Sequence, residues 1–278
     1  MPGIEISPES YVQFQEFLSS RSGIRLGDNK RYLVTNRLAG ICRNSGIESL
    51  DELIKNLIKG SLTHSLVTEI IDAMTTNETF WFRDVAQFQE LQQIVFPELS
   101  KNRMMTTRIW SAGCSSGQEA YSIGIAIDRY NRNNPTKALS NVQIVGTDIS
   151  ESILRRARNG RFSDLELSRG LDMESRSRYF VNSNGGWEFD KKISSKVQFQ
   201  FLNLQQSFSS LGQFELIFCR NVLIYFSDEL KKDILTRMVK ALKPSGYLFL
   251  SSTETIPNGL EQHLDLVKGR TVRYYRMT

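Results

Sequence analysis

Residues 108–122 read RIWSAGCSSGQEAYS, which is an apolar run followed by a turn of glycine and serine and then by the start of a helix. Small residues in such a turn let the backbone approach a ligand closely, and the amino-terminal end of the helix favours an anion. A strand, a glycine-containing turn and a helix in this order predict the first unit of an α/β sheet. A tight turn without any ligand would explain the same residues, so the turn alone leaves both interpretations open.

The chain after residue 84 continues the alternation of short apolar runs with helical ones. Strands are predicted at 108–112, 142–147, 197–202, 214–219, 247–251 and 271–276, and helices at 118–130, 150–159 and 227–242. Between residues 161 and 196 the alternation stops, and the turn sequence NSNGG at 182–186 indicates a small antiparallel insertion. We therefore expect a twisted, mostly parallel sheet that carries an inserted β-subdomain.

The amino-terminal part of the chain has a different pattern, because its periodic segments from Pro8 to about Thr75 are helical. Apolar residues recur three and four positions apart in the first segment, and Ser49 with Glu52 has the spacing of a helix-capping box. We expect a helical domain over residues 1–75, a linker over 76–84 and an α/β domain over 85–278, with the insertion at about 161–196.

Positive charge is concentrated in the helical part. Residues 21–43 account for the whole net charge of +5, since one acid, Asp28, stands among six basic residues: Arg21, Arg25, Lys30, Arg31, Arg37 and Arg43. Such a stripe can attract an acidic partner, either a nucleic acid or an anionic protein surface. A solvated helix face would have the same composition, so both interpretations stay open at this point.

Composition excludes several other classes of protein. With 40% hydrophobic and 23% charged among 278 residues, the chain is expected to fold as a globular protein. It has no apolar run of the roughly 18 residues of a membrane helix and no signal-peptide pattern at Met1, so we expect a soluble, cytoplasmic protein. Three dispersed cysteines and two distant histidines disfavour a disulfide framework, a metal site and histidine acid–base catalysis.

Polar residues follow several of the predicted strands, where an open parallel sheet binds its ligands. Asp148 follows the second strand, and its carboxylate can accept both hydrogen bonds of a ribose diol; it could also cap the helix that begins near residue 150. The pairs Asn203-Leu204 and Arg220-Asn221 follow the next two strands, and their polar members can address a purine edge or a cofactor backbone.

The linker contains three large aromatic residues within the sequence TTNETFWFRD at residues 75–84. Phe80, Trp81 and Phe82 could form an apolar wall over a ligand. They could equally form a hydrophobic hinge that docks two domains, with Arg83 paired to Asp84 or to another acid. Both interpretations can hold together.

Three separated motifs together resemble one family. They are TNETFWFR at 76–83, WSAGCSSGQEAYS at 110–122 and FCRNVLIYF at 218–226. Their order and spacing resemble those of the CheR family of chemoreceptor glutamate O-methyltransferases, which use S-adenosylmethionine. The resemblance implies a Rossmann-like methyltransferase sheet with an N-terminal all-α bundle and a small inserted antiparallel β-subdomain. Gln118, Ala120 and Trp81 depart from residues that are frequent in the family.

The resemblance also implies roles for individual residues. Glu119 and Asp148 would bind the methionine and ribose parts of the cofactor, Tyr225 would lie beside the transferring methyl group, and Arg83 would orient the attacking carboxylate. The full set implied for the cofactor is Asn77, Thr79, Arg83, Gly113, Glu119, Asp148, Asn203, Leu204, Arg220 and Asn221. The basic residues implied to hold the acidic receptor are Arg21, Arg25, Lys30, Arg31 and Arg37.

The implied reaction is an in-line displacement in which a receptor glutamate takes the methyl group and leaves S-adenosylhomocysteine. It requires no general base, since a carboxylate of pKa about 4.3 is ionised at neutral pH. The implied partner is the cytoplasmic helical bundle of a membrane chemoreceptor, and we expect a monomer that binds no nucleic acid and does not enter the membrane. In enteric members of the family the insertion binds a pentapeptide at the receptor's C-terminus. The segment between Phe180 and Asn203 looks shorter here, which disfavours such tethering.

Two rival interpretations share these features. A methyltransferase that acts on RNA or on a small molecule would have the same sheet and cofactor turn. A module that senses the cofactor and binds receptors without turnover would also retain the cofactor motifs, although Arg83 and Tyr225 favour an enzyme.

Overall fold

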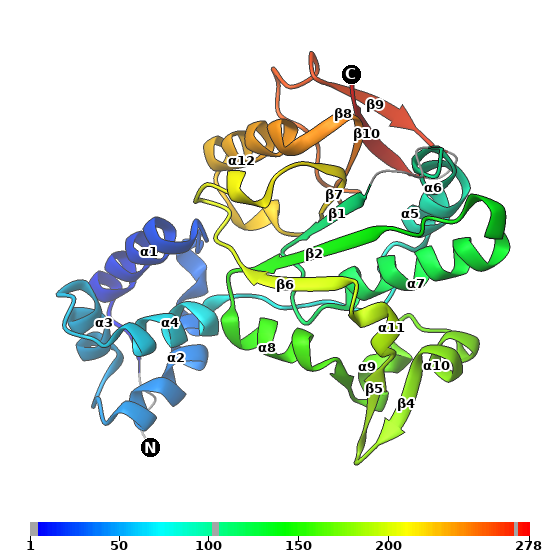
Figure 1. Ribbon diagram of the computed structural model, residues 1–278. Coiled ribbons are helices and arrows are strands. Elements are labelled where there is room, and N and C mark those ends of the chain that lie inside the picture. Colours follow the sequence, from blue (N-terminus) through cyan, green and yellow to red (C-terminus); the bar gives the residue numbers. More distant parts are fainter. Residues whose placement is uncertain (1–4, 102–105, 270–271) are drawn as a thin grey trace.

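The computed structural model describes residues 5–101, 106–269 and 272–278. The chain begins with four helices, which are α1 (Pro8–Ser22), α2 (Arg31–Ser45), α3 (Leu50–Ile58) and α4 (His64–Met74). They pack as a bundle around their own hydrophobic cluster, which includes Phe14, Leu38 and Leu53 (Figure 1). The hydroxyl groups of Ser7, Ser49 and Thr63 cap the amino-terminal ends of three of these helices.

Within the described residues, the main sheet has seven strands in the order β6-β2-β1-β7-β8-β10-β9. The first five in this order are parallel to their neighbours: β6 (Val197–Phe201), β2 (Val142–Asp148), β1 (Thr107–Ala112), β7 (Phe214–Cys219) and β8 (Leu242–Phe249). The antiparallel strands β10 (Arg273–Met277) and β9 (Leu264–Lys268) complete the edge.

Helices cover both faces of this sheet, because residues along each buried strand alternate between two hydrophobic clusters. Ile109 of β1 lies in one cluster with residues of α7 (Gln118–Asn133) and of the helical segment α5 (Val85–Glu90), η2 (Leu91–Val95) and α6 (Phe96–Leu99). Trp110 lies in the other cluster with residues of α12 (Asp228–Ala241). This layered arrangement is visible in Figure 1 and confirms the predicted α/β class.

The inserted segment leaves and re-enters the main sheet between β2 and β6. After α8 (Glu151–Asn159), it forms a three-stranded antiparallel sheet in the order β3 (Arg161–Phe162), β5 (Gly186–Phe189), β4 (Phe180–Ser183). Three short helices flank these strands: α9 (Asp164–Ser168), α10 (Met173–Tyr179) and α11 (Lys191–Ser194). The small antiparallel insertion predicted from the turn at 182–186 is thereby confirmed.

Some details of the sheet differ from the sequence prediction. Strand β9 was not predicted, because its sequence Leu-Asp-Leu-Val-Lys is half-exposed at the sheet edge and lacks a buried apolar run. Strand β8 begins five residues before the predicted 247–251, ahead of Pro244. The predicted strand at 271–276 overlaps β10, and its first residue lies outside the described residues. The division of the chain at residues 75 and 84 stays a prediction.

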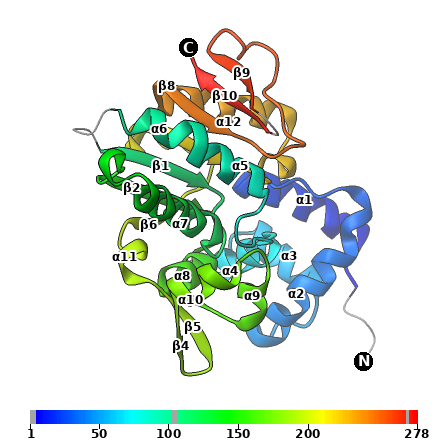
Figure 2. The same ribbon diagram turned by 90° about the vertical axis from the view of Figure 1, so that its right-hand side faces the viewer.

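The helical bundle lies against the edge of the main sheet at which the parallel strands end. Figure 2 shows α1 to α4 on one side of the molecule and the sheet with α7 and α12 on the other. Gln205, which follows β6, donates a hydrogen bond of 3.0 Å to the carbonyl oxygen of Ser19 in α1. Among the described residues, no helix is long and apolar enough to span a membrane.

Candidate functional site

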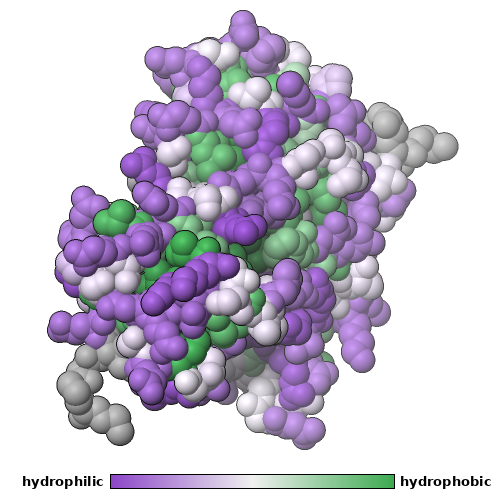
Figure 3. Space-filling model, turned by 90° about the vertical axis from the view of Figure 1, so that its left-hand side faces the viewer, coloured by the Kyte–Doolittle hydropathy of each residue, from purple (hydrophilic) through white to green (hydrophobic). Residues whose placement is uncertain are grey.

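A cavity of about 500 Å³ lies between the carboxyl ends of the strands, the linker and the helical bundle. This volume is within the range of roughly 300–1,000 Å³ that small-molecule sites have. Its walls bring together all residues that the sequence implicated in cofactor binding: Asn77, Thr79, Arg83, Gly113, Glu119, Asp148, Asn203, Leu204, Arg220 and Asn221. Figure 3 shows the molecule from the bundle side, where hydrophobic surface gathers in a furrow with hydrophilic margins.

The glycine turn after β1 forms one wall of this cavity. Gly113 has a left-handed φ of 71°, and a Cβ atom on it would lie 2.2 Å from Cγ2 of Val222. The amide groups of Gly113 and Cys114 both donate to the carbonyl oxygen of Thr147, at 2.8 and 2.9 Å. The turn is therefore tied to the end of β2, and only glycine fits at position 113 without displacing Val222.

Asp148 is held at the end of β2 by backbone groups. Its Oδ2 accepts a hydrogen bond of 2.9 Å from the amide of Ser115, and its Oδ1 accepts one of 3.0 Å from the amide of Ser150. Burial raises the pKa of this carboxyl, and these hydrogen bonds oppose the rise in part. The capping interpretation of Asp148 is wrong, because the hydroxyl of Ser150 caps α8.

Asp148 is therefore expected to make cofactor affinity depend on pH. The raised pKa means that the carboxyl takes up a proton on acidification before an ordinary aspartate of pKa about 3.9 would. The protonated carboxyl offers a bound hydroxyl group a weaker hydrogen-bond acceptor. We expect the affinity for S-adenosylhomocysteine, measured by calorimetry from about pH 8 to about pH 5, to fall on acidification. Asp148→Asn should bind about tenfold or more weakly at neutral pH and show a smaller pH dependence. An unchanged pH profile in this variant would contradict the role of Asp148.

Glu119 and Arg220 form a buried ion pair at the other end of the glycine turn. The side chains are 14% and 1% exposed, and Nη1 of Arg220 lies 3.0 Å from Oε2 of Glu119. The hydroxyl of Ser111 donates to Oε1 of Glu119 at 2.7 Å. Burial raises the pKa of Glu119, while Arg220 and Ser111 oppose the rise.

Two buried polar atoms of residues that line the cavity lack a hydrogen-bond partner among the described residues. Within the part of the chain that the structure describes, Nε of Arg220 and Oδ1 of Asn221 have no hydrogen-bond partner. Unpaired buried polar groups are costly, and Asn221 also has a left-handed φ of 59°. A ligand that carries both donors and acceptors would satisfy these atoms, which fits a nucleoside cofactor with an amino-acid tail.

The linker supplies the wall opposite the sheet. The carbonyl oxygen of Asn77 accepts a hydrogen bond of 2.9 Å from the hydroxyl of Ser115, which joins the linker to the glycine turn. The guanidinium of Arg83 lies 5.3 Å from the centre of the Phe80 ring, and both side chains line the cavity. The linker and the turn therefore hold one another in place.

The sequence left open whether the aromatic residues of the linker form a wall over a ligand or a hydrophobic hinge, and the structure assigns different residues to each role. Phe80 lines the cavity. Trp81 and Phe82 are buried in the main core instead, where Trp81 contacts Phe162 and Phe180 of the insertion at ring-centre distances of 4.9 and 5.2 Å. The wall interpretation is wrong for Trp81 and Phe82, which dock segments of the protein together.

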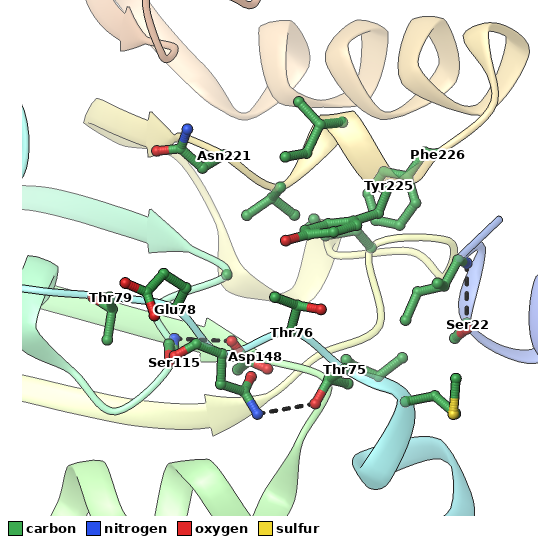
Figure 4. Close-up of a pocket in the computed structure, with 18 of the residues that line it drawn as sticks. Ser22, Thr75, Thr76, Glu78, Thr79, Ser115, Asp148, Asn221, Tyr225 and Phe226 are labelled. Atoms are coloured by element: carbon green, nitrogen blue, oxygen red, sulfur yellow. Dashed lines mark hydrogen bonds between the residues drawn. The ribbon is translucent and has the colours of Figure 1, made fainter. Parts of the chain in front are cut away.

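Tyr225 reaches the cavity from the segment after β7. Figure 4 shows its hydroxyl pointing into the space above Thr76 and Glu78 of the linker. Its carbonyl oxygen accepts a hydrogen bond of 2.9 Å from the amide of Arg25 in the bundle. The side chain thus lies where the bundle, the linker and the sheet meet.

The bundle closes the cavity through the turn after α1, a contact that the sequence analysis did not predict. The side-chain Nδ2 of Asn203 donates to the carbonyl oxygen of Arg21 at 2.7 Å. Gly23 has a left-handed φ of 76°, and a Cβ atom on it would lie 2.6 Å from Leu230 of α12. Asn203 therefore serves both the cavity wall and the junction with the bundle.

The basic residues of the bundle occupy different environments. Arg25, Lys30 and Arg37 line the cavity, and Arg21 and Arg31 do not; Arg21, Arg25 and Arg31 are exposed. Nη1 of Arg37 donates to the carbonyl oxygens of Met74 and Thr75, both at 2.9 Å, so this side chain closes the carboxyl end of α4. Of the two that do not line the cavity, Arg31 donates to the carbonyl oxygen of Ile6, and the guanidinium of Arg21 lies 5.9 Å from the centre of the Phe17 ring.

Fold and site define an S-adenosylmethionine-dependent methyltransferase: a parallel α/β sheet with a nucleoside-sized cavity at its carboxyl edge, closed by a helical bundle. The profile of the CheR methyltransferase S-adenosylmethionine-binding domain matches residues 77–273, and that of the CheR methyltransferase all-alpha domain matches residues 9–75. The chain belongs to the CheR methyltransferase family. S-adenosylmethionine is its cofactor, which the residues of the cavity fit.

Curated relatives match over nearly the whole chain. The chain is 45% identical to chemotaxis protein methyltransferase Cher2 of Pseudomonas putida, over 93% of this chain and 94% of the relative. It is 47% identical to chemotaxis protein methyltransferase 1 of Pseudomonas aeruginosa, over 92% and 93% of the two chains. The chemotaxis protein methyltransferase of Salmonella typhimurium is 30% identical, over 97% and 91%.

Proposed function

We propose that this methyltransferase transfers the methyl group of S-adenosylmethionine to glutamate side chains of chemoreceptors and forms glutamate methyl esters. One observation carries the proposal: the same cavity joins the cofactor-type residues of the sheet edge to Arg83 and Tyr225, and Arg25 and Lys30 of the bundle line it too. An acidic helical surface of a receptor is the partner that matches this charge. The names of the curated relatives support the same assignment.

The proposed chemistry needs few groups from the protein. The attacking carboxylate is ionised at neutral pH, so no base has to remove a proton from it. When bound, S-adenosylmethionine supplies the methyl group on an electrophilic sulfonium centre. The residues of the chain then have to bind the cofactor, align the carboxylate with the methyl group and exclude water. The set of side chains that lines the cavity is suited to these tasks.

Arg83 is proposed to orient the glutamate carboxylate. Charge alone would stabilise the carboxylate more than the partly neutralised transition state, and this would slow the reaction. A guanidinium can instead fix both carboxylate oxygens, and correct alignment contributes up to about 7–11 kcal/mol in favourable cases. Tyr225 is proposed to lie beside the methyl group and to confine it through its ring or its hydroxyl.

The test is methyl transfer from labelled S-adenosylmethionine to membranes of the source cell, followed by mild alkali. Methyl esters release volatile methanol under these conditions, so alkali-labile label on proteins of receptor size would support the proposal. Label that is stable to alkali, or label on RNA, would contradict it and assign the enzyme to another substrate class. Cofactor binding without any transfer would favour a sensing module.

Charge reversal at the rim of the cavity tests the proposed partner. Arg21 and Arg25 are exposed, so we expect the double variant Arg21→Glu, Arg25→Glu to fold normally. Its rate of receptor methylation at low ionic strength should fall about tenfold, and the dependence of the rate on salt should weaken.

A matched control for this variant is Lys101→Glu, Lys137→Glu. Both lysines are exposed and precede strands β1 and β2, so they lie at the opposite edge of the sheet. This double variant changes the net charge by the same amount and should methylate receptors at the normal rate. If the two double variants change the methylation rate equally, the charges of Arg21 and Arg25 do not steer a partner.

A further inference from the structure

We propose that Asp84 is a positioning residue for the methyl transfer: through Arg220, it holds Arg83 in place and links the methyl-acceptor side of the cavity to the cofactor side. The inference rests on the proposed function in one respect, because it takes Arg83 to orient the methyl acceptor. Asp84 follows Arg83 directly in the chain and precedes α5. Its contacts, its backbone and its charge support this role.

Arg220 contacts both sides of the cavity with one guanidinium group. Its Nη1 pairs with Glu119 beside the glycine turn at 3.0 Å. Its Nη2 donates to the carbonyl oxygen of Arg83 at 2.8 Å and pairs with Oδ2 of Asp84. The side chain of Arg220 is buried, and Glu119 and Asp84 bind its two terminal nitrogens, so these carboxylates fix its orientation. The backbone of Arg83 is thus connected to Glu119 through a single side chain.

The backbone around Arg83 is held in an uncommon conformation. The residues on either side of it, Phe82 and Asp84, have left-handed φ angles of 49° and 60°. Such angles in non-glycine residues persist where surrounding contacts enforce them. The amide of Phe82 donates to the hydroxyl of Ser122 at 3.0 Å, and its ring is buried. Asp84 is held by its pair with Arg220.

Helix capping does not account for the carboxylate of Asp84. Asp84 stands at the N-cap position of α5, where an aspartate side chain commonly accepts a backbone hydrogen bond. In the described structure, its side chain makes no such capping bond. It turns to Arg220 instead, which indicates that the pair with Arg220 takes precedence over stabilisation of the helix.

The charges of this network also suit the cofactor. Asp84 and Glu119 each carry one negative charge when ionised, and Arg220 carries one positive charge, so the three side chains have a net charge of −1. S-adenosylmethionine has a sulfonium, an ammonium and a carboxylate group, and its net charge is +1. An ammonium group that binds Glu119 would share this carboxylate with Arg220, and Arg220 would then interact more strongly with Asp84 and the Arg83 carbonyl. Cofactor binding would in this way fix Arg83.

Two substitutions separate the carboxylate from the backbone conformation. Asp84→Gly removes the acceptor for Arg220 and accepts the left-handed conformation without strain. Asp84→Asn retains an acceptor oxygen and tolerates the same conformation. We expect Asp84→Gly to lower kcat at least about tenfold. The Kd for S-adenosylhomocysteine should rise by a smaller factor, about three- to fivefold, because the cofactor and Asp84 are coupled through Arg220. Asp84→Asn should retain kcat within about threefold of the unmodified enzyme.

The control is Asp233→Asn in α12. Asp233 also pairs with an arginine, Arg237, at 2.6 Å, but neither residue lines the cavity. This variant should leave kcat and the Kd unchanged. If Asp84→Gly methylates at the normal rate, or if Asp84→Asn is as impaired as Asp84→Gly, the positioning role of Asp84 is contradicted.

Hydrogen exchange provides a readout that needs no methyl acceptor. S-adenosylhomocysteine should slow exchange of the amides at residues 82–86 in the unmodified protein and in Asp84→Asn, and should do so much less in Asp84→Gly. Equal protection in all three proteins would overturn the proposed link. If the unmodified enzyme forms no alkali-labile esters, the proposed receptor substrate fails, and this exchange experiment still decides the role of Asp84.

Discussion

Arg83→Ala is expected to lower kcat for receptor methylation about a hundredfold and to change the Kd for S-adenosylhomocysteine by less than about threefold. The guanidinium of Arg83 lines the cavity beside Phe80, and Nη1 makes one long contact of 3.4 Å with the carbonyl oxygen of Glu78. Its other donors are thus available to a carboxylate. The measurement is steady-state methylation with saturating cofactor, together with calorimetric titration of S-adenosylhomocysteine.

Arg83→Lys distinguishes orientation from charge. Lysine keeps the positive charge and loses the planar pair of donors that fixes both carboxylate oxygens. We expect this variant to recover little of the lost kcat. Full activity of Arg83→Lys would rule out the orientation role and would leave charge as the contribution of the residue.

Arg169→Ala is a matched control for the Arg83 variants. The guanidinium groups of Arg169 and Arg83 both lie 5.3 Å from the centre of the Phe80 ring. Arg169 is not among the residues that line the cavity, and it pairs with Glu78. Arg169→Ala should therefore disturb the contact with the Phe80 ring about as much as Arg83→Ala does. It should leave kcat within about threefold of normal. An equal loss of activity in both variants would indicate a general effect on the linker.

Gly113→Ala is expected to weaken binding of S-adenosylhomocysteine at least about a hundredfold. The new Cβ would lie 2.2 Å from Cγ2 of Val222, which is too close for any contact, so the turn or Val222 has to move. Both line the cavity beside Asn221. Calorimetric titration of the cofactor product and the midpoint of thermal unfolding would be measured together.

Gly60→Ala provides the comparison for this variant. Gly60 has a φ of 70°, close to the 71° of Gly113, but a Cβ atom there would meet no atom within 4 Å. The backbone strain of an alanine is thus similar at the two positions, and only Gly113→Ala adds the clash. Gly60→Ala should bind the cofactor product normally. Addition of Val222→Ala to Gly113→Ala should restore part of the affinity, and its failure to do so would contradict the steric explanation.

The sequence could predict the polar cavity residues at the strand ends, because parallel strands place their carboxyl ends at one edge of a sheet. Asp148, Asn203 and Arg220 lie at or just after the ends of three different strands. Their assignment to one site requires only the strand order of an α/β fold. The resemblance to the CheR family added the linker residues Asn77 and Arg83, since these lie on no strand. The structure brings all of them to the same cavity.

Other features depend on distances that no local pattern encodes. The pair between Asp84 and Arg220 joins residues 136 positions apart, and neither neighbourhood in the sequence indicates the other. Trp81 stands beside Phe80 in the chain, yet one lies in the core and the other in the cavity. The position of the insertion decides this, because its residues Phe162 and Phe180 pack against Trp81.

The amino-acid sequence by itself determined the class of fold, the insertion and the motifs whose residues line the cavity, because periodicity, turn chemistry and motifs are local properties. Only the tertiary structure decided which basic side chains of the bundle are used in contacts within the protein and which can contact a partner. Arg37 closes the end of α4, whereas Arg25 lies at the cavity with its backbone bonded to Tyr225. The physical reason is that a side chain acts through the partners that folding brings to it, and the spacing of residues along the chain does not specify those partners.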